Sequence, residues 1–254
     1  MEKLSVTILQ YRVPNNRVAV FYLGQAGFVF KTPDGVLTVV DPYLTNCCER
    51  FFGFKRLMPF MLDPTELSFD VVLATHAHYD HFDIDAMPAL LSSERTRLIA
   101  AEDCRELCVR LGLDPSRITY LQRYDTFDCC GIRIEAVPCD HGELAPYAVG
   151  ILLSFPGKKV YITGDTAFRS DIFENPALHD ADLLILPING MFGNMNESEA
   201  ASAARLLTPK ITIPCHFWNF AEHGGNPSLF IRYMKETAPD IPFTLMRIGE
   251  ILLI

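Results

Sequence analysis

The stretch 75–83, "THAHYDHFD", concentrates side chains that bind metal ions. It holds three of the chain's seven histidines together with two aspartates, in the spacing H-x-H-x-D-H. His76 and His78 are two residues apart, so in an extended segment both side chains point the same way. Asp80 and His81 follow directly, and the segment can therefore place nitrogen and oxygen donors around two neighbouring points. The alternative is a polar loop with solvated histidines, which this density of donors disfavours.

Three further candidate ligands each follow a predicted strand. His141 ends "IEAVPCDH", Asp165 ends "VYITGD" and His216 ends "ITIPCH". Taken alone, each is more simply a turn or capping residue. Ligands at the ends of strands in one sheet can nevertheless converge on a single edge, which is where α/β proteins place their sites. Together with the stretch 75–83, they predict a metal site built from distant parts of the chain.

The elements that must position these residues are mostly strands. Apolar, β-rich runs indicate an antiparallel meander near the start of the chain, followed by alternating strands, loops and helices. Two packed sheets with helices outside would bury all of them. The segment 42–62 has no clean period and is predicted to be a long loop. Strands are predicted at 18–23, 27–32, 36–41, 70–75, 97–101, 131–138, 148–155, 158–164, 181–187, 211–214, 243–249 and 251–254. Helices are predicted at 102–112, at 227–238 and at 196–208, where Asn196 and Glu199 are expected to form a capping box. A further helix is predicted within 83–93, where Pro88 indicates that it is short or begins there.

Length and composition favour a single folded domain over residues 1–254. The chain is 49% hydrophobic, and no linker or low-complexity segment divides it. Its net charge of −9 argues against a nucleic-acid partner, because phosphate binding needs clustered Lys and Arg. The chain shows neither a secretory leader nor an apolar run long enough to span a membrane, so we expect a cytoplasmic protein. The eight cysteines, without a C-x-x-C pair, are expected to be free thiols.

As a set, these motifs resemble the metallo-β-lactamase-fold hydrolases, which carry H-x-H-x-D-H followed by a histidine, an aspartate and a histidine in this order. Within that superfamily the chain is similar to the L-ascorbate-6-phosphate lactonase-like branch, through "YLGQAGFVFKTPDG", "DPYL", "NGMFGNMN" and "CHFWNFAEHGG". The resemblance implies an α+β protein with the αβ/βα four-layer sandwich and a two-metal site.

The resemblance also implies a ligand set. His76, His78 and His141 would hold one ion, Asp80, His81 and His216 the other, and Asp165 would bridge them. Imidazole and carboxylate donors suit two divalent ions, Zn²⁺ or Mn²⁺, with Fe also open. Two such ions can share a water and lower its pKa, so that a hydroxide attacks the substrate.

One member of this set and one residue outside it are given further roles. Asp80 is the first candidate for acid/base catalysis as well as a ligand. Asp41, before Pro42, is expected to orient a ligand histidine from behind, with a simple strand stop as the alternative.

The function predicted on this basis is dinuclear-metal hydrolysis of a small molecule. The first candidate is a lactonase or esterase acting on a sugar-acid phosphate or similar lactone. The alternative is a phosphodiesterase with the same site; an iron-dependent oxidoreductase and a non-catalytic metal-binding module rank lower. His223 and Asn194 are expected to contact the substrate, which could be anionic, and a homo-oligomer is left open. The loop 42–62 carries cations among phenylalanines, which could line the site or, as we prefer, pack in the core or an interface.

Overall fold

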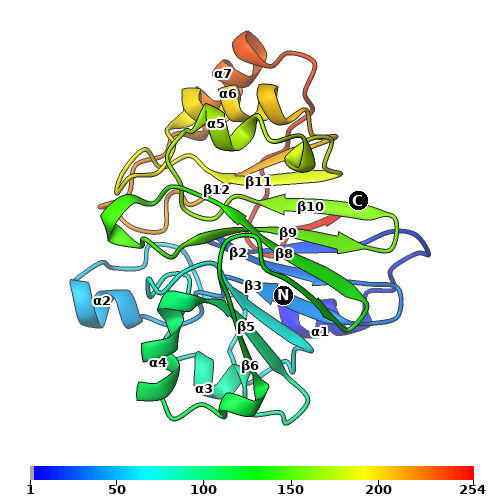
Figure 1. Ribbon diagram of the computed structural model, residues 1–254, viewed down its shortest axis with the longest axis vertical. Helices are drawn as coiled ribbons and strands as arrows, with labels where there is room; N and C mark the ends of the chain where they lie inside the picture. Colours follow the sequence, from blue (N-terminus) through cyan, green and yellow to red (C-terminus); the bar gives the residue numbers. More distant parts are fainter. Residues whose placement is uncertain (1–2) are drawn as a thin grey trace.

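The computed structural model describes residues 3–254 and shows two β-sheets packed face to face, with helices on both outer sides (Figure 1). The first sheet has the order β13-β1-β2-β3-β4-β5-β6, and the second has the order β12-β11-β10-β9-β8-β7. This is the four-layer αβ/βα sandwich that the sequence predicts. The first sheet comprises β1 (Ala19–Gly24), β2 (Gly27–Lys31), β3 (Leu37–Val40), β4 (Val71–Ala74), β5 (Arg97–Ala101), β6 (Ile118–Leu121) and β13 (Ile251–Leu253). The second comprises β7 (Thr126–Cys129), β8 (Ile132–Pro138), β9 (Val149–Phe155), β10 (Lys158–Ile162), β11 (Leu183–Pro187) and β12 (Thr212–Cys215).

The central strands are buried on both faces, which explains their continuous apolar runs. Alternate side chains of a strand point to opposite faces of its sheet. In β4, Val71 and Leu73 enter the core between the two sheets, while Val72 and Ala74 enter the core under the outer helices. The strand is fully buried along its length, as predicted. The stretch 75–83 therefore begins at the end of a fully buried strand.

Helices cover the outer face of each sheet. On the first sheet lie α1 (Leu4–Gln10), α2 (Cys47–Phe52), α3 (Met87–Leu90) and α4 (Arg105–Arg110), and on the second lie α5 (Ser170–Phe173), α6 (Glu197–Leu207) and α7 (Pro227–Thr237). The side chain of Asn196 accepts hydrogen bonds from the backbone of the first turn of α6, and Glu199 completes the predicted capping box. No helix in residues 3–254 is long and apolar enough to cross a bilayer. The eight cysteines are free.

Two predictions about local structure, those for 243–249 and 42–62, are wrong. The segment 243–249 is not a strand: it forms one isolated bridge, between Phe243 and Thr212, after which the chain leaves the edge of β12 to join the other sheet at β13. The predicted helix 83–93 is short and begins beside Pro88, as that proline indicates: only α3 forms, because Asp83 and the turn around it occupy the first residues. The loop 42–62 contains the short helix α2, which ends at Gly53 in the left-handed conformation.

Candidate metal centre

Strand ends from both sheets deliver the candidate ligands to one edge of the sandwich. His76 lies two residues after β4 in the first sheet, and His216 directly follows β12 in the second. His141 and Asp165 each come three residues after the end of their strand, β8 and β10 respectively. In Figure 1 this is the side of the molecule that carries α2. Residues that are distant in sequence are thus gathered at the place that the strand-end pattern predicts.

Three histidines form the first group of donors. His76 Nε2 lies 3.0 Å from His78 Nδ1, which in turn lies 3.3 Å from His141 Nε2. Burial lowers the pKa of His76 well below its ordinary value and lowers the pKa of His141 to about 4. Both rings are therefore held in the neutral form, which is the form that binds a metal. We name these three residues the three-histidine group.

A second, mixed group lies beside the first. His216 Nε2 is 3.2 Å from Asp80 Oδ2 and also 3.2 Å from His81 Nε2. His81 and His216 are 135 positions apart in the sequence. We name Asp80, His81 and His216 the mixed group.

Asp165 lies between the two groups. Its Oδ1 is 3.3 Å from His81 Nε2, its Oδ2 is 3.2 Å from His216 Nε2, and the same Oδ2 is 3.8 Å from His141 Nε2. Burial works against the charged carboxylate, but His216 and His81 hold the pKa of Asp165 well below its ordinary value. A single ionised carboxylate thus reaches donors of both groups.

The carboxylates around the mixed group raise the pKa of both of its histidines. Burial alone would lower the pKa of His81, yet Asp165, Asp80 and Asp41 raise it well above the ordinary value. For His216 the same carboxylates outweigh burial and raise the pKa to about 9. A divalent cation would supply the positive charge that the protons of these histidines supply here, and binding it would release them.

The donor set fits metal ions. Ring nitrogens of different histidines lie 3.0 to 3.3 Å from one another, and the carboxylates of Asp80 and Asp165 lie beside them. Three combinations bring three ligand atoms within 4.8 Å of one another: His76 with His78 and His141, His76 with His81 and Asp165, and Asp80 with His216 and His223. Imidazole nitrogen and carboxylate oxygen are ligands that Zn²⁺, Mn²⁺ and Fe accept. No thiol is needed: Cys215, next to His216, is buried in the core between the sheets.

Asp41 lies behind His81, in the position expected of it. The fully buried carboxylate lies 2.8 Å from His81 Nδ1 and accepts hydrogen bonds from the backbone N–H and the hydroxyl of Thr75. A carboxylate on the far nitrogen of an imidazole fixes its orientation and raises its basicity toward a metal.

An Asp41→Asn variant is expected to bind the ion of the mixed group about 10- to 100-fold less tightly, since an amide cannot hold His81 as a carboxylate does. Competition with a metal-responsive dye measures this affinity. Asp83→Asn is the matched control: Asp83 is equally buried in the same stretch, but it accepts from Leu44 and Thr45 and not from the centre. Equal losses in both variants would mean that Asp41 supports only the fold.

Gln25 is a contact residue that the sequence analysis missed. Its Nε2 donates to Asp80 Oδ2 at 2.8 Å and lies 3.0 Å from His216 Nε2 and 3.3 Å from His223 Nδ1, while its Oε1 is buried without a partner among the described residues. It has φ +52 in the turn between β1 and β2. The signal in the sequence was a single amide in "YLGQAGF", a stretch between two strands that are otherwise apolar.

The two expected substrate contacts have different surroundings. His223 stacks on His216 with ring centroids 4.8 Å apart and an interplanar angle of 9°, and it lines a cavity of about 430 Å³ beside both donor groups. Asn194 is buried, donates to Asn189 Oδ1 at 3.1 Å and is not among the residues that line this cavity. Of the two residues, only His223 therefore lies where it could contact a substrate in this cavity.

The sandwich and the His/Asp centre at its edge are those of the metallo-β-lactamase fold. The chain belongs to that superfamily: residues 19–216 match the family described as the "Beta-lactamase superfamily domain". It is 32% identical over 237 residues to a UPF0173 metal-dependent hydrolase of Cupriavidus necator, across 84% of this chain and 78% of that protein. It is 29% identical to a UPF0173 metal-dependent hydrolase of Rubrobacter xylanophilus, across 90% and 93% of the two chains.

A solved structure shares the whole fold. Igni18, a metallo hydrolase from the archaeon Ignicoccus hospitalis, matches with a TM-score of 0.73 and 22% identity over 94% of this chain and 98% of that chain. The protein is thus a hydrolase of the metallo-β-lactamase superfamily.

Proposed function

We propose that this hydrolase opens an ester or lactone bond of a small molecule with two divalent metal ions, as the lactonase-like branch would. One observation carries the proposal. Six histidine and aspartate side chains form two adjacent donor groups, and a seventh, Asp165, lies between the groups, beside a cavity of about 430 Å³. A cavity of this size is in the range that encloses a small ligand.

Each donor group would hold one ion. The three-histidine group would take the first, the mixed group the second, and Asp165 would contact both. Two ions so held would lower the pKa of a shared water and polarise the substrate oxygen.

The chain's own side chains supply the proton handling and the orientation. Asp80 is the more exposed of the two carboxylates, with 14% of its side chain accessible against 6% for Asp165, and it lines the cavity. It is therefore the group that we assign to accept the proton of the attacking water. Gln25 holds that carboxylate from behind, and His223, stacked on His216, faces the substrate.

A phosphodiesterase is the second candidate, because the run H-x-H-Y-D-H and the same two groups would serve an attack on phosphorus equally well. Whether a carboxylic ester or a phosphodiester bond is cleaved depends on which substrate reaches the centre, because the same donors would serve both reactions.

Removal of the metal is expected to abolish hydrolysis, and restoration of Zn²⁺ or Mn²⁺ to bring it back. The measurement is a screen of chelator-treated and metal-reconstituted protein against lactones, 4-nitrophenyl esters and bis(4-nitrophenyl) phosphate. Faster turnover of lactones or esters supports the first candidate, and faster turnover of the phosphodiester supports the second. Full activity after chelation, with no metal left in the protein, would contradict both.

A further inference from the structure

The walls of the cavity beside the metal centre are apolar. Its floor consists of the donor side chains, and around them stand mainly aromatic and aliphatic residues. Among the residues that the structure describes, none that lines this cavity is Lys or Arg. The apolar walls are Phe52, Phe54, Tyr79, Leu144, Phe192 and Phe220.

These walls are continuous from the protein surface to the centre. Phe54 lies 6.2 Å from Phe52 on α2 and 5.9 Å from Phe192 on the loop after β11, measured between ring centroids. Phe192 lies 5.3 Å from His223, which stacks on a ligand histidine. An apolar group could therefore stay in contact with carbon along the whole path.

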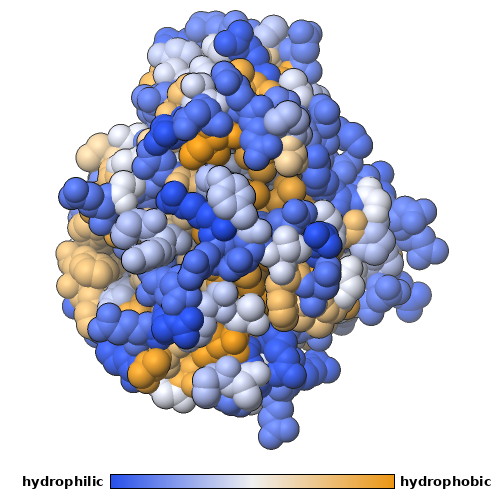
Figure 2. Space-filling view, in the orientation of Figure 1, coloured by the Kyte–Doolittle hydropathy of each residue, from blue (hydrophilic) through white to orange (hydrophobic). Residues whose placement is uncertain are grey.

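The outer part of this wall exposes apolar side chains to solvent, which is energetically unfavourable. Phe52, Leu144 and Phe192 are 56%, 55% and 42% exposed. Figure 2 shows apolar surface on the side where Figure 1 places α2. Clustered exposed apolar side chains around a cleft are typical of a ligand-binding groove.

The cationic side chains of the loop 42–62 and its surroundings do not line the cavity. Arg56 donates to the backbone oxygens of Tyr43 and Thr45, and Lys55, although exposed, does not line the cavity. Arg110 donates to the hydroxyl of Tyr79. Phe52 and Phe54 of this loop line the cavity, and Phe54 also packs against the core under the outer helices, as preferred for the loop.

We infer that the substrate carries an alkyl or aryl group next to the scissile bond, and no phosphate on that arm. This inference rests on the proposed function, since it names the substrate class of the same site. The metal ions would engage the scissile group, so a phosphate elsewhere on the substrate would need a cation of its own, and the walls offer none. They offer instead carbon surface, which stabilises an apolar group by removing it from water.

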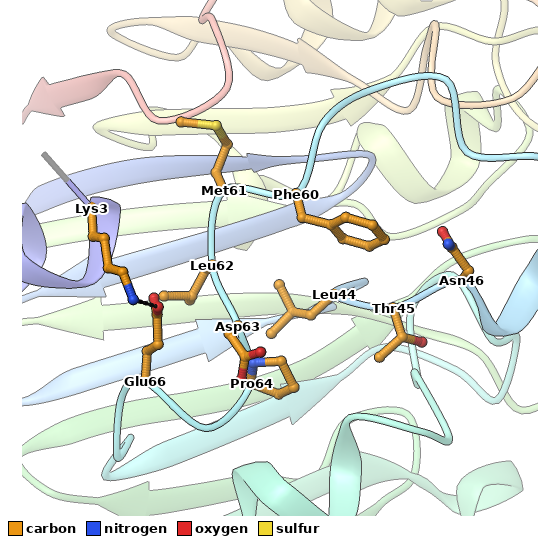
Figure 3. A pocket seen from close by; sticks show the side chains of 10 residues that line it. All are labelled: Lys3, Leu44, Thr45, Asn46, Phe60, Met61, Leu62, Asp63, Pro64 and Glu66. Carbon is orange, nitrogen blue, oxygen red and sulfur yellow. Dashed lines mark hydrogen bonds and ion pairs between the residues drawn. The ribbon is translucent and has the colours of Figure 1, made fainter. Parts of the chain in front are cut away.

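A second cavity supplies the control residue. It measures about 600 Å³, shares no lining residue with the first and includes the ion pair between Lys3 and Glu66 (Figure 3). Phe60 on its wall is 50% exposed, close to the value for Phe52. Truncation of Phe60 therefore removes a matched aromatic side chain away from the metal centre.

The test compares γ-octalactone with γ-butyrolactone and with 6-phosphogluconolactone on the metal-reconstituted protein. We expect kcat/KM for γ-octalactone to exceed that for γ-butyrolactone by about tenfold or more, since four further carbons are buried. Phe192→Ser and Phe52→Ser should each reduce this ratio several-fold, and Phe60→Ser should leave it unchanged. Calorimetry gives a readout without turnover: 4-phenylbutyrate should bind about tenfold more tightly than butyrate, and less so in Phe192→Ser.

The outcomes separate this inference from the proposed function. Equal rates for the two simple lactones, or a preference for the phosphorylated one, would overturn the inference and leave the hydrolase intact. Failure to hydrolyse any lactone or ester would overturn the proposed function. The binding preference for 4-phenylbutyrate would then still decide the inference: its presence supports apolar walls that receive a ligand, and its absence refutes them.

Discussion

An Asp165→Ala variant is expected to lose at least one of the two metal ions that we propose for the wild-type chain. Asp165 is the only carboxylate in the described structure that lies within 4 Å of donors from both groups, reaching His81, His216 and His141. Its removal takes one anionic ligand from each ion and leaves buried histidines without their charge partner. Elemental analysis after dialysis against metal-free buffer measures the number of ions per chain.

Asp182→Ala is the matched control for that variant. Asp182 is also a buried aspartate, but it is held by Lys158, Lys210 and the backbone of Lys159, outside the centre. It should lose stability without losing metal. If Asp165→Ala retained both ions, the bridging role would be refuted, whatever the effect on stability.

The second large effect is expected from His76→Ala, which should lower kcat/KM by about 10³-fold or more, since several kcal/mol of transition-state stabilisation depend on a correctly held ion. His76 is fully buried, and its Nε2 lies 3.0 Å from His78 Nδ1. No other side chain can take its position at the start of the stretch. The measurement is the hydrolysis rate of the best substrate from the screen, at saturating metal.

His179→Ala controls for the loss of a histidine as such. The ring of His179 lies 2.8 Å from the backbone oxygen of Phe173 and takes no part in the centre. Circular dichroism of both variants separates loss of the ion from loss of the fold. An unchanged rate in His76→Ala would place the chemistry elsewhere in the molecule.

A large part of the fold could be predicted from local patterns. The strand β4 and the helices α6 and α7 were recognisable because apolar periodicity and capping residues act over a few neighbouring positions. The segment 243–249 shows the limit of this reasoning. It has the composition of a strand, but pairing depends on an available edge, and the chain leaves the edge of β12 after one bridge.

For the candidate site, too, some features could be predicted from the sequence and others could not. The spacing H-x-H-x-D-H indicated donors around two neighbouring points, and the family resemblance implied that His76 and His78 belong to one of them and Asp80 and His81 to the other. The role of Asp83 could not be separated from theirs by type or spacing. Only the structure shows that it holds Leu44 and Thr45.

The sequence by itself determined the donor chemistry and the superfamily, because both depend on residue types in a fixed order. The tertiary structure alone decided which side chains surround those donors. Gln25 reaches Asp80 across a gap of 55 positions, and Phe54 meets Phe192 across a larger one. Such contacts are set by how two sheets and their loops pack, and no short-range pattern encodes them. For this protein, these long-range contacts define the apolar walls from which we infer the substrate class.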